Sequence, residues 1–158
     1  MLIHSNQPNV AVTTICVKCC VQSSQPIFHY VPGLGTYKVH TNALPWHKAR
    51  KICTEEGGHL AVLNSEAEVE KISELAREAE HHDGKFYRTQ FHIGIHNLYD
   101  KDEWVTIQGE SLEAAGYSEW YEGEPNRNGL GCGAISYTNN KLYDSSFETS
   151  LGFICELS

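Results

Sequence analysis

The sequence predicts an α+β domain, because two helical patterns in its first half are followed by short strand-like runs in its second half. The helical patterns cover residues 45–56 and 65–84. The strand-like runs lie at residues 91–95, 103–107, 132–137 and 152–157. A polar stretch rich in Gly, Asn and Pro covers residues 109–131. A loop of this length inside a compact domain is usually functional or disordered, so it is a candidate binding loop.

The first helix has its own start and stop signals. Residues 28–39 before it predict two short strands around Pro32-Gly33. Pro45 lies near the first helical turn, and two glycines follow the last. Cys53 lies on the apolar face of this helix, so we expect it to face the core. A short apolar strand is predicted next, at residues 59–63.

The second helix has the clearest start signal in the chain. Ser65 is a good N-cap, and Glu68 three residues later completes a capping box. One apolar stripe then follows at helical spacing: Val69, Ile72, Leu75, Ala76 and Ala79. The acidic side chains at 66, 68, 70 and 74 are interpreted as the solvated face of this helix.

Composition narrows the class of protein. The 158 residues suffice for one domain, and 41% hydrophobic with 20% charged residues is typical of a globular protein. The formal net charge of −8 argues against nucleic acid and anionic membrane surfaces as partners, because both are bound mainly by Lys and Arg. No apolar run approaches the roughly 20 residues of a membrane-spanning helix.

The six cysteines, at positions 16, 19, 20, 53, 132 and 155, favour disulfide chemistry. No two pairs of them have the spacing of a four-thiolate zinc site. A disulfide between distant cysteines is the better interpretation, and it implies an oxidising compartment.

Residues 1–27 differ from the rest and are interpreted as a leader or a disordered segment. Residues 10–17 form an apolar run of signal-peptide length, and residues 21–23 loosely fit a cleavage site. However, no Lys or Arg precedes the run. A signal peptide, a disordered tail and a sequence whose true leader is missing all remain open. Residues 28–158 are predicted to form the folded domain.

Several motifs, taken in order, resemble those of the C-type lectin-like family. They are Cys53 with residues 57–62 (Gly-Gly-His-Leu-Ala-Val), residues 92–95 (His-Ile-Gly-Ile), Trp120, the triplet Glu124-Pro125-Asn126, Cys132, and residues 153–156 (Phe-Ile-Cys-Glu). The segments 32–40, 49–68 and 109–120 are most similar to insect hemolymph lectins of the lipopolysaccharide-binding-protein type. The resemblance covers residues 30–158.

The resemblance implies a C-type lectin-like fold, with two helices flanking small antiparallel sheets and a long binding loop. It also pairs Cys53 with Cys155, which joins the first helix to the last strand. A disulfide that closes a loop of about 100 residues stabilises a fold by roughly 4–5 kcal/mol at most.

The resemblance further implies a calcium site that binds sugar. Its side chains here are Glu124, Asn126 and Asp144, as calcium ligands and as hydrogen-bond partners of sugar hydroxyls. Oxygen ligands suit Ca²⁺, which takes 6–8 of them. In the family the proline of the triplet is cis, and a Glu-Pro-Asn triplet goes with a preference for mannose-type sugars.

The sequence departs from the family pattern at three positions. Tyr143 stands where the family has an asparagine ligand, and Leu130 where it has a further glutamate. Three of five side-chain ligands therefore remain, and Asn128 or main-chain carbonyls are the candidates to replace the others. A competing interpretation is that the triplet is only a turn, because Pro and Asn are turn formers.

The third departure leaves Cys132 without its usual partner, because Phe147 occupies the family's cysteine position. Three fates stay open: a buried free thiol, a pair with an N-terminal cysteine, or a bridge between two chains. The last of these would make a homo-oligomer.

Other chemistries have weaker support. His92 and His96 would share a strand face and His81-His82 are adjacent, but no third ligand is spaced to complete a zinc site. Nothing near Cys132 indicates an activated thiolate, and no phosphate loop or nucleophile elbow occurs. We therefore expect a binding protein and not an enzyme.

The sequence thus predicts a secreted lectin that recognises microbial surface glycans in innate immunity, with Ca²⁺ as cofactor if enough ligands remain. A lipopolysaccharide would be bound through its sugars, because the net charge of −8 repels its negatively charged phosphates. Stacking on Tyr99, Tyr117 or Tyr121 is a further route to sugar binding, whereas Trp120 is expected in the core, as the resemblance implies. The alternative is a lectin-fold module for protein interactions that has lost calcium-dependent sugar binding.

Overall fold

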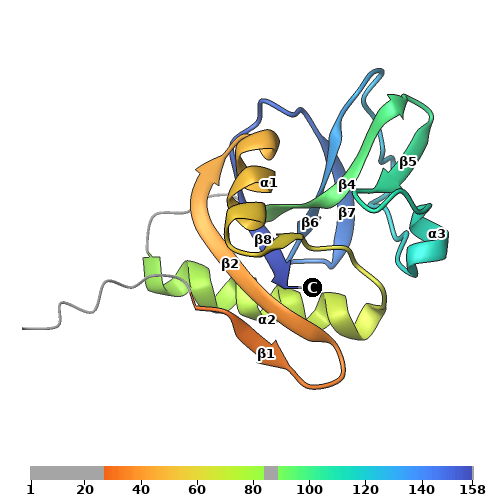
Figure 1. The fold of residues 1–158 in the computed structure, drawn as a ribbon. Helices are drawn as coiled ribbons and strands as arrows, with labels where there is room; N and C mark the ends of the chain where they lie inside the picture. The colour runs from red at the N-terminus through yellow and green to blue at the C-terminus, as the bar shows by residue number, and fades with distance from the viewer. Residues whose placement is uncertain (1–26, 84–88, 158) are drawn as a thin grey trace, which may run out of the picture.

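The computed structural model describes residues 27–83 and 89–157, which fold into helices and one connected sheet (Figure 1). The predicted α+β class is confirmed. The N-terminal leader prediction concerns residues 1–27, nearly all of which lie outside the described residues.

The chain begins with a hairpin of β1 (His29–Val31) and β2 (Gly35–Leu44). Gly33 has φ +77 and the N–H of Leu34 donates to the carbonyl of Val31, so the turn needs a residue without a β-carbon at this position. The predicted pair of strands is confirmed, although β2 extends five residues beyond the predicted end and curves along α2.

Helix α1 (Trp46–Glu55) matches the prediction closely. It buries Trp46, Ala49 and Cys53, as expected from their helical spacing. The helix ends where Gly57 adopts φ +89. The following strand β3 (Gly58–Leu60) is shorter than predicted, because the N–H of Val62 donates to the Glu156 side chain and not to a strand.

Helix α2 (Glu66–Asp83) begins as predicted, with the Ser65 hydroxyl accepting from the N–H of Glu68 at 3.2 Å. The interpretation of all four glutamates as a solvated face is wrong at Glu68, which is only 2% exposed. Its carboxylate turns inward, where it accepts hydrogen bonds from the Tyr37 hydroxyl and from the N–H of Asn64.

The remaining strands are longer and more connected than the sequence indicates. They are β4 (Gln90–Asp100), β5 (Glu103–Thr106), β6 (Cys132–Ser136), β7 (Lys141–Ser145) and β8 (Leu151–Leu157). The main path runs β1-β2-β8-β4-β6-β7, with β3 paired to β8 and β5 to β4. All pairs are antiparallel except β4 with β8, so the expected small antiparallel sheets are joined through one parallel pair.

Two elements were not predicted. Strand β7 and the short helix α3 (Leu112–Ala115) both lie in segments of mixed polarity. Ser111 caps α3, and Gly116 ends it with φ +115, a conformation that favours glycine. The long polar stretch therefore contains a helical turn, and its loop is shorter than expected.

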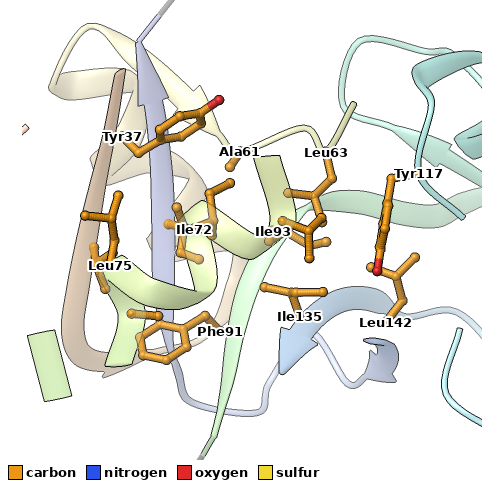
Figure 2. Packing of buried hydrophobic residues seen from close by; sticks show 14 of the residues in the cluster. Tyr37, Ala61, Leu63, Ile72, Leu75, Phe91, Ile93, Tyr117, Ile135 and Leu142 are labelled. Atoms are coloured by element: carbon orange, nitrogen blue, oxygen red, sulfur yellow. The ribbon is translucent and has the colours of Figure 1, made fainter. Parts of the chain in front are cut away.

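The core consists of two clusters of buried side chains. The larger one lies between α2 and the sheet, where Ile72 and Leu75 of α2 pack with Tyr37, Phe91 and Ile93 (Figure 2). The smaller one lies between α1 and β8 and contains Trp46, Ala49, Cys53, Leu60, Cys132, Phe153 and Cys155.

A disulfide joins Cys53 of α1 to Cys155 of β8, as the resemblance implied. Both cysteines are fully buried, and they are 102 positions apart in the sequence. The bond therefore lies inside the smaller core cluster and joins α1 to the strand that runs through the middle of the sheet.

Candidate functional site

The candidate site lies where the loop after α3 passes along strand β7. Residues 119–121 run beside the strand: the N–H of Leu142 donates to the carbonyl of Glu119, and the N–H of Tyr121 donates to the carbonyl of Leu142. Trp120 and Leu142 pack toward the core. Because side chains alternate along a strand, the neighbours of these two residues face outward.

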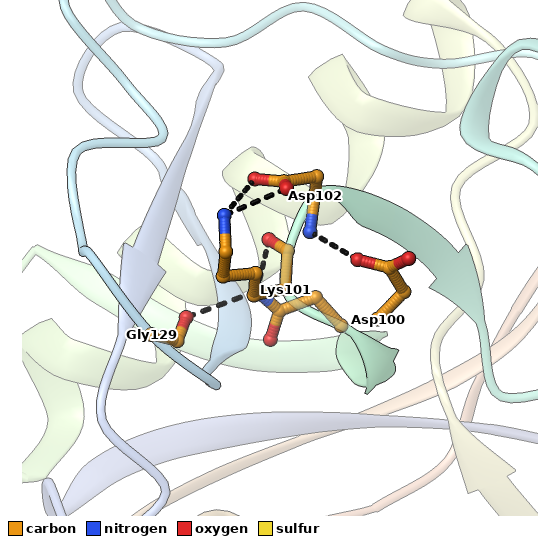
Figure 3. A network of polar contacts seen from close by, with 5 residues as sticks. Asp100, Lys101, Asp102 and Gly129 are labelled. Atoms are coloured by element: carbon orange, nitrogen blue, oxygen red, sulfur yellow. Dashed lines mark hydrogen bonds and ion pairs between the residues drawn. The ribbon is translucent and has the colours of Figure 1, made fainter.

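Asn97 of β4 holds the returning half of the loop. Its side-chain amide donates to the carbonyls of Lys101 and Gly129 at 2.9 and 3.1 Å, and its oxygen accepts from the N–H of Gly131. Figure 3 shows Gly129 beside the turn that contains Lys101 and Asp102. The side chain of Asn97 is 1% exposed, so it fixes the loop from inside the fold.

The structure brings together the three predicted site residues, although Asp144 is distant in sequence from the triplet. The amide of Asn126 donates to Glu124 Oε1 at 2.8 Å, and the N–H of Asp144 lies 3.4 Å from Glu124 Oε2. The N–H of Arg127 donates to Asp144 Oδ2 at 2.7 Å. The Glu124–Pro125 peptide bond is cis, as in the family pattern.

Two carboxyl groups converge at this point. Burial, together with the side chain of Asp144 through hydrogen bonding and charge repulsion, raises the pKa of Glu124 to about 7. Carboxylates that face each other are stabilised by a shared proton or by a cation between them. The pair therefore has the charge and the ligand type that suit a hard cation.

The residues that depart from the family pattern have other contacts. The ring of Tyr143 stacks on Tyr121, with centroids 5.0 Å apart and planes 18° from parallel. Its hydroxyl accepts from the side-chain amide of Asn139 at 2.7 Å. Leu130 is 50% exposed and supplies no oxygen from its side chain.

Phe147 takes the place of the family's second cysteine in the smaller core cluster. Its ring stacks on His47 and meets the edge of Trp46. Cys132 is accordingly a free thiol with no exposed surface. Burial raises the pKa of Cys132 to about 12, so the thiol stays protonated and is not an activated nucleophile.

The histidines of β4 serve packing. The Nε2 of His92 lies 3.1 Å from the carbonyl of Leu44 and 2.9 Å from that of Thr149, so this nitrogen is the donor. In residues 27–83 and 89–157, the one group of three close His, Cys, Asp or Glu ligands is His40, Glu56 and Cys155. The sulfur of Cys155 is in the disulfide, so this group does not provide a thiolate.

We expect acidification to destabilise the fold through His92. Burial lowers the pKa of His92 from 6.5 to about 4. Between these values the unfolded chain binds a proton that the folded chain does not, so stability rises with pH across this window and is lost as the pH falls. The effect of His92 alone is about 3 kcal/mol.

Urea unfolding at a series of pH values from 4 to 7 measures this effect. The variant His92→Gln retains an amide donor but does not titrate, so its stability should depend less steeply on pH. Parallel pH profiles for the two proteins would exclude His92 as the cause.

Solved structures have the same architecture. The C-type lectin CEL-I from Cucumaria echinata matches with a TM-score of 0.72 and 19% identity, over 83% of this chain and 94% of its own. Human lithostathine matches with a TM-score of 0.70 and 19% identity, over 83% of this chain and 88% of its own. The fold is therefore that of the C-type lectins.

The family model for the lectin C-type domain matches residues 42–157. The chain belongs to the C-type lectin family. The matched region is a lectin domain, and its relatives are named as lectins or as a lipopolysaccharide-binding protein, in agreement with the expectation of a binding domain.

Two curated relatives show where this chain lies in the family. The hemolymph lipopolysaccharide-binding protein of Periplaneta americana is 34% identical over 138 residues, which are 85% of this chain and 54% of that protein. The hepatic lectin of Gallus gallus is 26% identical over 140 residues, 87% of this chain and 60% of that protein. The chain thus spans little more than half the length of either relative.

No helix within the described ranges combines the length and the apolar character that crossing a membrane requires.

Proposed function

We propose that this chain is a secreted lectin that binds glycans of microbial surfaces through Glu124, Asn126 and Asp144, with the help of Ca²⁺. The observation that carries the proposal is the convergence of two carboxyl groups and one amide at the end of β7. A simple turn at the triplet needs no carboxylate from a separate strand, so the placement of Asp144 favours a site.

The donor set fits calcium at reduced affinity. Two carboxylates and one amide oxygen provide up to five oxygen atoms, and Ca²⁺ completes its shell of 6–8 with carbonyls, water or a ligand's hydroxyls. Tyr143 and Leu130 remove two side-chain ligands that the family pattern would add. Affinity for Ca²⁺ depends on ligand number and charge, so we expect it to be weaker than with a full set.

Glu124, Asn126 and Asp144 would hold the calcium ion, which would supply a positive charge that attracts the hydroxyl oxygens of a sugar. Glu124 and Asn126 would hydrogen-bond the same hydroxyls, the carboxylate as acceptor and the amide as donor. The Glu-Pro-Asn triplet supports a preference for mannose-type sugars. The net charge of −8 supports contact with sugars rather than with the phosphates of a lipopolysaccharide.

Two findings support action outside the cell in innate immunity. The buried disulfide between Cys53 and Cys155 suits an oxidising compartment. The relative with 34% identity is named for its occurrence in hemolymph and its binding of lipopolysaccharide.

The test combines isothermal titration with Ca²⁺ and retention on mannose-agarose, with and without EDTA. We expect Ca²⁺ uptake and retention that EDTA abolishes. The variant Glu124→Gln should lower the affinity for Ca²⁺ at least about tenfold, because it removes a charged ligand.

Glu122→Gln is the matched control, since Glu122 is an exposed glutamate two positions away in the same loop. It should bind as the unchanged protein does. Absence of both Ca²⁺ uptake and retention would overturn the proposal and favour a protein-interaction module with the lectin fold.

A further inference from the structure

The outer face of strand β7 carries side chains in matched pairs with the loop beside it. The Nζ of Lys141 lies 3.2 Å from Glu119 Oε2. Two residues further along both segments, the rings of Tyr121 and Tyr143 stack on each other. Asp144 is the next residue of β7, and its N–H lies 3.4 Å from Glu124 Oε2, so the carboxyl groups of the candidate site come next along the strand. The segments run parallel, as the bridge between residues 120 and 142 shows, so the two pairs and the carboxyl groups follow one another in order along a line beside β7.

An open cavity of about 570 Å³ lies at the far end of this line. Its lining is polar and comes from the start of α2, the segment after α3 and the turn between β6 and β7. It includes Glu66, Tyr117, Glu119, Asn139, Asn140 and Lys141. The amide of Asn139 donates to the Tyr143 hydroxyl, so the cavity and the ring pair are in direct contact.

The middle of the line has an accessible aromatic surface. Tyr121 is 46% exposed although it stacks on Tyr143, so part of the ring pair remains open to a ligand. Aromatic faces attract weakly polarised C–H groups and cover apolar surface. The two faces of a pyranose ring carry such C–H groups, whereas its rim carries hydroxyls.

The ends of the line carry groups that bind hydroxyls. Carboxylates accept from them, and amides both donate and accept. A strand rises about 3.3 Å per residue, so Lys141 and Asp144 are separated by about 10 Å along β7. That separation exceeds the size of one sugar ring.

From this arrangement we infer that the protein binds an extended neutral oligosaccharide rather than a single terminal sugar. The candidate calcium site holds one sugar unit, the ring pair of Tyr121 and Tyr143 stacks on the next, and the polar cavity receives the chain beyond it. A neutral chain is favoured because the cavity has two glutamates against one lysine. The inference rests on the proposed function, which places the first sugar.

Titration calorimetry with methyl α-mannoside and with a linear mannotriose tests the inference in calcium buffer. We expect the trisaccharide to bind about five- to tenfold more tightly, the gain that a stacked ring contact provides. Tyr121→Ser should bring the ratio of the two affinities close to one. Tyr30→Ser is the control, because Tyr30 is 73% exposed and lies on β1, at the opposite end of the strand order from β7.

A second measurement does not depend on any variant. Amide shifts of Lys141 and Tyr143 in NMR spectra should change with the trisaccharide and not with the monosaccharide. Equal affinities of both sugars for the unchanged protein, with no shift at these amides, would overturn the inference and leave the proposed function standing. If neither sugar binds, the proposed function fails and the extension fails with it.

Discussion

Replacing Cys53 and Cys155 together by alanine is expected to lower the free energy of unfolding by up to about 4–5 kcal/mol. The bond joins residues that are 102 positions apart, and it restricts the conformations of the unfolded chain. Without the bond the unfolded chain has more conformational entropy, so unfolding is more favourable. A typical domain has only about 5–15 kcal/mol of stability, so the variant should be close to unfolding at physiological temperature. Urea unfolding of the oxidised protein and the double variant measures the loss.

Cys132→Ala is the matched control for this experiment. Cys132 belongs to the same core cluster and is equally buried, but it makes no cross-link. We expect it to cost about 1 kcal/mol, for the small cavity left by the sulfur. Equal losses in the two variants would show that the cross-link itself contributes little.

Replacing Glu68 by alanine should destabilise the protein by about 4 kcal/mol, an unusual cost for a glutamate near the start of a helix. Two hydrogen bonds are lost, a buried one from the Tyr37 hydroxyl and a partly buried one from the N–H of Asn64. Burial raises the pKa of Tyr37, so its hydroxyl remains a donor that needs an acceptor. An unsatisfied buried donor costs about 1–3 kcal/mol.

Glu70→Ala is the comparison, because Glu70 lies on the same helix and is exposed. Its effect should stay within about 0.5 kcal/mol. Denaturant unfolding of the two variants separates them, and Glu68→Gln should fall between, since an amide oxygen can still accept. Similar stabilities for Glu68→Ala and Glu70→Ala would contradict the buried role of Glu68.

The sequence predicted the elements whose signals are local. The capping box at Ser65, the helical spacing around Cys53 and the glycines that end α1 all depend on neighbours within a few positions. Such signals can be recognised without knowledge of the fold. The boundaries of β2 and β4 were too short, because strands extend as far as their partners do and those partners are distant in sequence.

Strand β7 was missed because its side chains alternate between a buried leucine and outward polar or aromatic groups over only five residues. Its pairing with β6 and with the loop beside it cannot be seen locally. The role of Tyr143 depends on that pairing. In the sequence Tyr143 only marks the loss of a calcium ligand of the family pattern, whereas in the structure its ring stacks on Tyr121.

By itself the sequence determined the α+β class, the two long helices and the family, and it singled out the three side chains proposed as the candidate site. Only the tertiary structure decided that Glu68 is buried, that Cys132 is a free thiol in the core, and that the carboxyl groups of Glu124 and Asp144 meet. The physical reason is that these properties belong to contacts between distant segments. A side chain's burial, charge state and partners are set by the strands and helices that pack against it.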